Sequence, residues 1–158
     1  MRRLRGYKLV KAFPIGAMNM PVEFSEIDAA AEAILRLSAT DASATVFHPY
    51  NNHLITFADV IYVMREYGFK LEILPDDAFQ RHLNAQMKHP AVSDAVGGLI
   101  AYMSNDAQGI RYMLDSSCDF TTQALYRLGF KWPITDSGYV RRMINVLDGL
   151  GMFDARDK

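Results

Sequence analysis

Cysteine is almost absent from this sequence, because Cys118 is the only one among 158 residues. A single thiol cannot form an internal disulfide or assemble a cysteine-rich zinc site. Long apolar runs are also missing: residues 9–22 are interrupted by charged, proline and glycine residues, and no segment approaches the ~20 apolar residues of a membrane span. We therefore expect a cytoplasmic protein without a membrane partner.

An excess of charge of one sign is missing as well. The sequence has 17 lysines and arginines against 18 acidic residues, a formal net charge of −1, which gives no overall field for attracting nucleic acid. Only Arg2, Arg3, Arg5 and Lys8 form a basic cluster, which is typical of a solvated terminus and less often of an anion or phosphate contact. With 50% hydrophobic and 22% charged residues, the composition predicts one folded domain, or one domain and a fragment.

Complete motifs for catalysis or cofactor binding are lacking. A dinucleotide site needs a glycine-rich turn between a strand and a helix, but residues 97–98, both glycine, lie in a helical pattern. Neither a P-loop nor the G-x-S-x-G nucleophile elbow occurs. We therefore expect no catalytic residue and no bound cofactor in this chain.

The histidines and the cysteine do not form a recognisable site either. His48, His53, His82 and His89 are scattered, without the i, i+4 pair and carboxylate of zinc hydrolases, so no metal site is expected. His48 and His53 flank a turn after a predicted strand, where ligands often meet open parallel sheets, although structural or solvated roles compete. Cys118 is expected to be a small buried hydrophobe rather than a nucleophile.

Periodicity and capping signals predict a helix-rich α/β fold of the mixed α+β kind. Helices are expected over residues 26–38, 56–68, 75–88, 93–103, 121–128 and 136–147, strands over 45–48 and 70–74, and a short extended segment over 111–114. The two strands and the helix between them predict a small parallel βαβ unit.

The apolar stripes predict which side of each helix faces the core. In the helix over residues 26–38 the inward residues are expected to be Ile27, Ala30, Ala31, Ile34 and Leu35. In the helix over 56–68 they are Phe57, Val60, Ile61 and Met64, and in the last helix Tyr139, Val140, Met143, Ile144 and Leu147. Trp132 is interpreted as an anchor between the last two helices.

Residues 1–24 follow neither helical nor strand periodicity for long, so we expect an irregular segment. Its apolar residues need a cover, because a monomer rarely exposes a large apolar patch. We therefore expect Phe13, Ile15, Met18 and Met20 to be either disordered or packed against a second copy of the chain, most simply in a symmetric homodimer.

Five segments, read in order, resemble the C-terminal portion of the thioester reductase domains that end nonribosomal peptide and polyketide assembly lines, relatives of carboxylic acid and fatty acyl reductases. The segments are residues 21–34 (PVEFSEIDAAAEAI), 45–52 (TVFHPYNN), 65–79 (REYGFKLEILPDDAF), 114–130 (LDSSCDFTTQALYRLGF) and 139–153. Glu23 departs from the aspartate that this family tends to have, and Pro49-Tyr50 departs from its usual turn.

The resemblance implies the C-terminal subdomain of an extended short-chain dehydrogenase/reductase fold. Residues 25–158 would be the substrate-side subdomain and residues 1–24 a remnant of the cofactor domain. The Rossmann portion, with its glycine-rich loop and tyrosine–lysine pair, would lie upstream of Met1. The complete enzyme would use NADPH to release a peptidyl or acyl thioester, held on the phosphopantetheine arm of a carrier protein, as an aldehyde or alcohol.

In that arrangement the channel for the acyl group would be lined by residues at strand ends and turns near the missing portion. These substrate-binding residues are expected to be Met20, Glu23, Phe47, His48 and Asn51. Two other readings remain open at this point. The chain could be a self-standing, non-catalytic binding or regulatory module with the same fold, or, least favoured because no nucleophile, base and orienting group can be identified, a small independent hydrolase.

Overall fold

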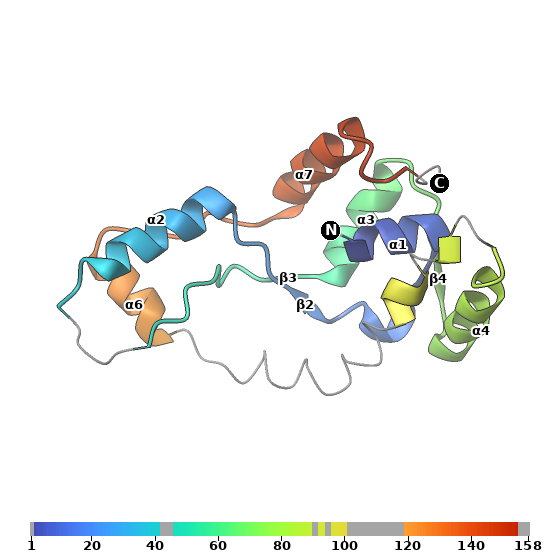
Figure 1. Cartoon of the computed structure of the whole chain (residues 1–158), viewed down its shortest axis with the longest axis horizontal. Coiled ribbons are helices and arrows are strands. Elements are labelled where there is room, and N and C mark those ends of the chain that lie inside the picture. Colours follow the sequence, from blue (N-terminus) through green and yellow to red (C-terminus); the bar gives the residue numbers. More distant parts are fainter. Residues whose placement is uncertain (1, 42–45, 90–91, 94–95, 101–118, 155–158) are drawn as a thin grey trace.

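The computed structural model describes residues 2–41, 46–89, 92–93, 96–100 and 119–154. Figure 1 shows two lobes joined by extended segments of chain. The first lobe holds α1 (Arg2–Val10), α3 (Phe57–Glu66), α4 (Asp76–Gln86) and α7 (Ser137–Gly149). The second lobe holds α2 (Ile27–Ser38) and α6 (Asp119–Arg127). The chain passes between the lobes ahead of α2, ahead of α3 and again between α6 and α7.

Two small sheets accompany the helices. β1 (Ala12–Pro14) pairs with β4 (Glu72–Leu74) in parallel, with Phe13 opposite Ile73. β2 (Pro21–Val22) pairs with β3 (Ile55–Thr56) in the antiparallel direction. The expected mixed, helix-rich fold with a small parallel sheet is confirmed.

The prediction of a strand over residues 45–48 is wrong for the residues that the structure describes. Residues 46–48 form no strand, and the parallel partner of β4 is β1. β1 has only three residues and ends in Pro14, so it gives no alternating pattern that sequence reasoning could recognise. The expected βαβ unit is therefore wrong: β4 does have a parallel partner, but that partner is β1, and β2, α2 and β3 lie between them in the chain as well as α3.

The prediction that residues 1–24 form an irregular segment is also wrong. It contains α1, β1, the short 3-10 helix η1 (Ile15–Ala17) and β2. Tyr7, Phe13 and Val10 are at most 1% exposed and belong to the core of the first lobe, whereas Ile15 is 57% exposed. Met18 is buried and Met20 is half-buried against the same core. Phe13 and Met18 are thus covered by the chain itself, so the expectation that they are disordered or packed against a second copy is wrong for these two residues.

Basic residues interrupt the apolar pattern of α1, so the sequence did not predict this helix. Several of these basic residues make structural contacts. The guanidinium of Arg3 lies 4.5 Å from the centre of the Phe57 ring. Arg5 donates two hydrogen bonds to the carbonyl of Asp154, and Lys8 donates one of 2.9 Å to the carbonyl of Phe153. The basic start therefore holds the C-terminal turn against α1 and is not simply a solvated terminus.

Capping chemistry fixes the start and end of α3 as expected. Thr56 and Asp59 form a reciprocal capping box at its first turn. Hydrogen bonding from Thr56 lowers the pKa of Asp59 below its usual 3.8. At the other end Gly68 has a φ of 110°, which glycine adopts readily, and the amide of Phe69 donates to the carbonyl of Met64.

The remaining predicted helices start and end close to the expected residues. α4 begins after Pro75, α6 ends before Gly129 (φ 74°), and α7 begins after Asp136, whose carboxylate accepts a hydrogen bond from the amide of Tyr139. The described residues of the helix expected over 93–103 are 93 and 96–100, and they are helical. The extended segment expected over 111–114 and Cys118 lie outside the described residues.

Two separate apolar cores correspond to the two lobes. The first contains Val60, Ile61, Met64, Val140 and Ile144, so the expected inward faces of α3 and α7 are confirmed. The second core consists of Ala33, Leu37, Leu125, Phe130 and Trp132. Trp132 therefore packs between α2 and α6 rather than between the last two helices.

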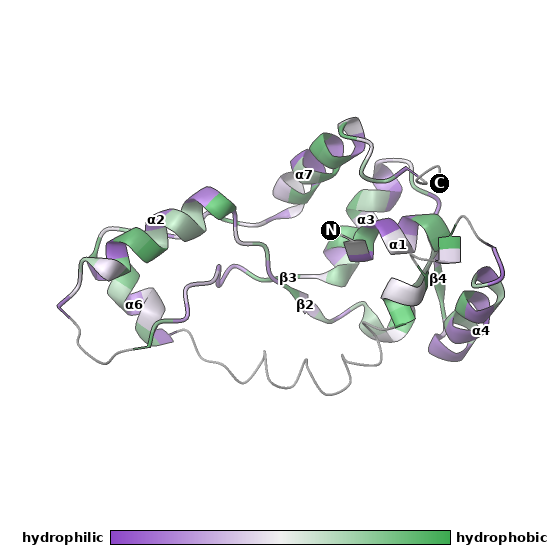
Figure 2. Cartoon of the chain, in the orientation of Figure 1, coloured by the Kyte–Doolittle hydropathy of each residue, from purple (hydrophilic) through white to green (hydrophobic). Residues whose placement is uncertain are grey.

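The inward face expected for α2 is wrong except at Ala30, which packs against the second core. Ala33 and Leu37 are the buried residues of this helix, whereas Ile27, Ile34 and Leu35 are 81%, 54% and 70% exposed. Figure 2 shows apolar residues along α2 and a mainly hydrophilic α4. Because α2 is apolar on more than one side, its pattern alone could not tell which side meets α6.

Candidate functional site

Asn51 occupies the region where the three connecting segments meet. Its side chain is fully buried, and its amide donates to the carbonyl of Phe24 at 3.1 Å and to that of Pro133 at 2.9 Å. Its side-chain oxygen accepts a hydrogen bond of 3.0 Å from the amide of His53. Both donors and the acceptor of this side chain are therefore used to tie together the chain ahead of α2, the chain ahead of α3 and the chain that leads to α7.

Further hydrogen bonds strengthen this junction. The hydroxyl of Ser25 accepts from the backbone amide of Asn51 at 2.9 Å and donates to the carboxylate of Glu23. The hydroxyl of Thr135 donates to the carbonyl of His53. Ser25 and Asp28 have the spacing of a capping box at the start of α2, but the residue at that cap is Glu26 and no side chain bonds there. The serine is instead used by the junction, which fixes the relative course of the segments between the lobes.

Phe47 and His48 lie in the second lobe, next to α6. The ring of Phe47 stacks on that of Phe120, with centres 5.8 Å apart and planes 19° apart. The amide of His48 donates a 2.9 Å hydrogen bond to the hydroxyl of Thr121, which is buried. These contacts hold residues 46–49 in an extended course along α6 without a strand partner.

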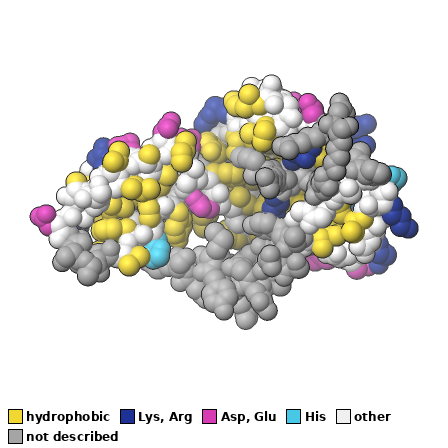
Figure 3. Space-filling model, viewed as in Figure 1, with side chains coloured by type: hydrophobic (Ala, Val, Ile, Leu, Met, Phe, Trp, Pro, Cys, Tyr) yellow, Lys and Arg dark blue, Asp and Glu magenta, His cyan; other side chains and the backbone are white. Residues whose placement is uncertain are grey.

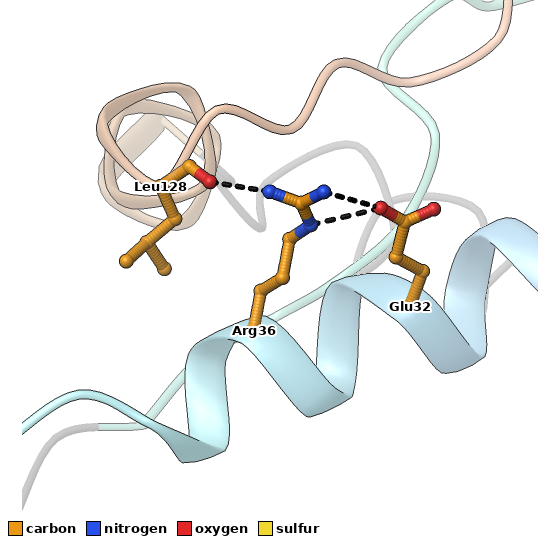
Figure 4. Close-up of polar contacts among 3 residues, drawn as sticks. All are labelled: Glu32, Arg36 and Leu128. Atoms are coloured by element: carbon orange, nitrogen blue, oxygen red, sulfur yellow. Dashed lines mark hydrogen bonds and ion pairs between the residues drawn. The ribbon is translucent and has the colours of Figure 1, made fainter.

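Arg36 joins the two helices of the second lobe (Figure 4). Its guanidinium donates to the carbonyl of Leu128, near the C-terminal end of α6, and pairs with Glu32 one turn earlier on α2 at 2.6 Å. A cation at a helix C-terminus is favourable because it meets free carbonyl groups. Arg36 thus fixes the C-terminal end of α6 against α2.

A groove lies between α2 and the extended segment that follows it. Its volume is about 430 Å³, within the range of small-molecule sites. The lining is mainly apolar and consists of Ile34, Leu37, Ser38, Thr40, Phe47 and Pro49. Of the five predicted site residues, Phe47 alone is in this lining.

The apolar surface continues beyond the groove. Figure 3 shows hydrophobic side chains gathered over the α2 and α6 end of the molecule. Exposed large apolar residues of the second lobe include Ile27, Ile34, Leu35, Val46, Phe120 and Tyr126, each at least 54% exposed, and we call them together the second-lobe face. Because soluble monomers rarely expose so many large apolar side chains together, this face is suited to contact with another apolar surface.

The predicted site residues do not form one site. Met20 packs against the core of the first lobe, while Phe47 belongs to that of the second. Glu23 and Asn51 are linked through Ser25 at the junction, and His48 is exposed beside α6. Glu23 and Asn51 thus lie at the junction and Phe47 in the groove, and the substrate-binding role of all five residues stays a prediction.

The sequence also contains a tyrosine followed four residues later by a lysine, Tyr7 and Lys11, so the spacing of a tyrosine–lysine pair occurs within this chain. It matches the tyrosine–lysine pair with which short-chain reductases protonate a carbonyl. Tyr7 is 0% exposed, its ring centre lies 4.6 Å from that of Phe13, and its hydroxyl accepts a hydrogen bond from Arg3. A substrate carbonyl has no access to that hydroxyl, so the pair serves packing rather than proton transfer.

No cluster of three or more metal-ligating side chains occurs within the described ranges. The same part of the chain contains no helix that is both long and apolar enough to cross a membrane. His82 instead contacts the carbonyl of Val10 through its Nε2 atom at 2.7 Å, which ties α4 to the end of α1.

No family model and no curated protein matches this sequence. Solved structures, in contrast, match nearly the whole chain. A thiolation-reductase di-domain from an archaeal non-ribosomal peptide synthetase is 24% identical, with a TM-score of 0.75 over 97% of this chain and 31% of its own. The terminal R domain from the myxalamid PKS-NRPS biosynthetic pathway is 19% identical, with a TM-score of 0.75 over 99% of this chain and 40% of its own.

The chain shares its fold with part of these reductase domains. The resemblance derived from five sequence segments is thereby confirmed at the level of the fold. The chain spans about a third to two fifths of the length of these two structures, so it corresponds to a part of them.

Proposed function

We propose that this chain is the substrate-side, C-terminal part of an NADPH-dependent thioester reductase. The complete enzyme would take a peptidyl or acyl thioester from a carrier protein and release it as an aldehyde or alcohol. The observation that carries the proposal is the fold match, which covers 97–99% of this chain but only 31–40% of the two reductase structures. A missing Rossmann portion would supply NADPH and the catalytic tyrosine and lysine.

The second-lobe face supports this proposal independently of the match. Its large side chains, such as Leu35 at 70% exposure and Val46 at 73%, lack a cover. Residues 46–49 run extended without a strand partner. A neighbouring domain that packs on α2 and beside this segment would bury both features, and we assign that role to the missing portion.

The groove between α2 and Phe47 would then form part of the channel for the acyl group. Its apolar lining suits an acyl or peptidyl chain, and Phe47 and His48 would face that chain from the segment next to the missing portion. Met20 and Glu23 would contribute from the connection ahead of α2. Asn51, whose polar groups are all bonded, would act by holding these segments in place.

A second reading has one specific observation in its favour. Tyr7 and Phe13 are fully buried in the core of the first lobe, so these side chains need no second copy or further domain to cover them. That feature suits a self-standing, non-catalytic binding or regulatory module. In such a module the second-lobe face would bind a separate partner.

The coding sequence immediately upstream separates the two readings. An in-frame glycine-rich strand–turn–helix followed by a tyrosine–lysine pair would support the reductase reading, and its absence would favour the module. The upstream portion, made as a separate protein, should then bind this chain. Replacing Ile34 and Leu35 by serine should weaken that binding at least tenfold, because it removes apolar area from the contact. Leu150→Ser, equally exposed at 71% but in the first lobe, is the matched control.

A further inference from the structure

A second groove, on the first lobe, is lined by positive charge. It has a volume of about 610 Å³ and lies between the end of α1 and the turn that joins α3 to β4. Three cations line it: Lys11 after α1, Arg65 near the end of α3 and Lys70 in the turn. The other lining residues are Gly68, Phe69, Leu71 and Glu72.

These three cations are exposed and uncommitted. In the part of the chain that the structure describes, none of them has a carboxylate within 4.0 Å or makes a side-chain hydrogen bond. Other cations close by are engaged, since Lys8 bonds the carbonyl of Phe153 and Arg141 pairs with Glu66 at 2.6 Å. Glu72 is the one acidic residue among the described residues of the lining, so these residues give the groove a positive charge although the whole chain carries a formal charge of −1.

The backbone at Lys11 adds an independent observation. Its φ is 56°, and within the described ranges it is the one residue other than glycine with a positive φ. Three other helix ends place Gly68, Gly129 or Gly151 in such a conformation. Glycine would be favoured at position 11 for the same reason, because a side chain is disfavoured there. The sequence nevertheless has a lysine there, and this lysine is one of the residues that line the positive groove.

We propose that this groove binds a compact phosphate group. Lysine and arginine form charge-assisted hydrogen bonds with phosphate oxygens, and an arginine can bind two of them at once. A groove of this volume suits a small molecule. Three cations that line one groove suit an anion with several negative charges on one group better than the dispersed carboxylates of an acidic protein. This inference does not depend on the proposed reductase function.

The test is a titration of the full chain with inorganic diphosphate, followed by calorimetry at low and at high salt. Wild type should bind saturably, and more weakly as salt rises. Lys11→Gly should weaken binding by about three- to fivefold, the expected share of one exposed charge contact, while the melting temperature stays the same or rises. Arg65→Gln with Lys70→Gln should remove saturable binding. Lys131→Ala, which removes one exposed charge from the second lobe, should leave the affinity unchanged.

Several results would overturn the proposal. Absence of saturable diphosphate binding by wild type is one, and equal effects of Lys11→Gly and Lys131→Ala are another. Tighter binding of hexaglutamate than of diphosphate, with loss in Lys11→Gly, would replace the phosphate by an acidic protein segment as the partner. Because Lys11→Gly is expected to preserve folding, a loss of binding in that variant cannot be ascribed to unfolding, and its melting curve checks this directly.

Discussion

Replacement of Asn51 by leucine should destabilise the protein by about 3 kcal/mol. The side chain is 0% exposed and makes three hydrogen bonds, two donated at 3.1 and 2.9 Å and one accepted at 3.0 Å. Each such bond contributes about 1 kcal/mol net. Asn51→Asp should be at least as damaging at neutral pH, because a carboxylate would face the carbonyl oxygens of Phe24 and Pro133.

The pH dependence of Asn51→Asp gives a sharper signature. Burial beside two carbonyls should raise the folded-state pKa of the new carboxyl above its unfolded value of about 3.9. A raised folded pKa means that stability is recovered as the pH falls, since the protonated acid can again donate a hydrogen bond. The deficit of this variant against wild type should therefore shrink from pH 7 to pH 4. Asn52→Asp, at an exposed neighbouring position, should change stability by less than about 0.5 kcal/mol.

Urea unfolding followed by two signals provides the assay. Trp132 is the single tryptophan and lies in the core of the second lobe, so its fluorescence reports that lobe, while far-UV circular dichroism reports both. In Asn51→Leu the fluorescence transition should come first, because the junction no longer couples the lobes. A loss below about 0.5 kcal/mol with coincident transitions would refute the role of Asn51 as the junction residue.

Two other predictions concern the first lobe. Ile61→Ala should cost about 2–5 kcal/mol in denaturant unfolding because Ile61 is 0% exposed, whereas Ile27→Ala, at 81% exposure, should cost under about 0.5 kcal/mol; similar costs would contradict the assigned faces. Thr56→Ala should cost about 1 kcal/mol through loss of the capping box. The lowered pKa of Asp59 makes this contribution fully present above the usual value of 3.8 and lost as the pH falls through the folded pKa. A deficit that stays constant down to pH 2 would contradict that assignment.

The sequence predicted elements whose ends carry strong local signals. Thr56, Asp59 and Gly68 determine α3, and Asp136 determines the start of α7, because capping and glycine conformations depend on nearby residues alone. α1 was missed because its apolar residues are spread among arginines and lysines. β1 was missed because a three-residue strand becomes stable only when β4, sixty residues away, pairs with it.

The candidate site was predictable only in part. Three of the predicted site residues, Phe47, His48 and Asn51, come from residues 45–52. The junction and the apolar groove both include members of this segment. The role of Asn51 depends on the carbonyls of Phe24 and Pro133, which no local pattern encodes. The positive groove could not be predicted for the same reason, because Lys11 is far from Arg65 and Lys70 in the sequence.

Reduction of a carrier-bound acyl thioester by NADPH tests the central claim most directly. The chain would be assayed alone and joined to the portion encoded upstream, with aldehyde or alcohol release and NADPH oxidation both measured. The account predicts turnover by the joined protein and none by either part alone. Turnover by this chain alone, or its absence from a folded joined protein that contains the glycine-rich loop and the tyrosine–lysine pair, would contradict the account.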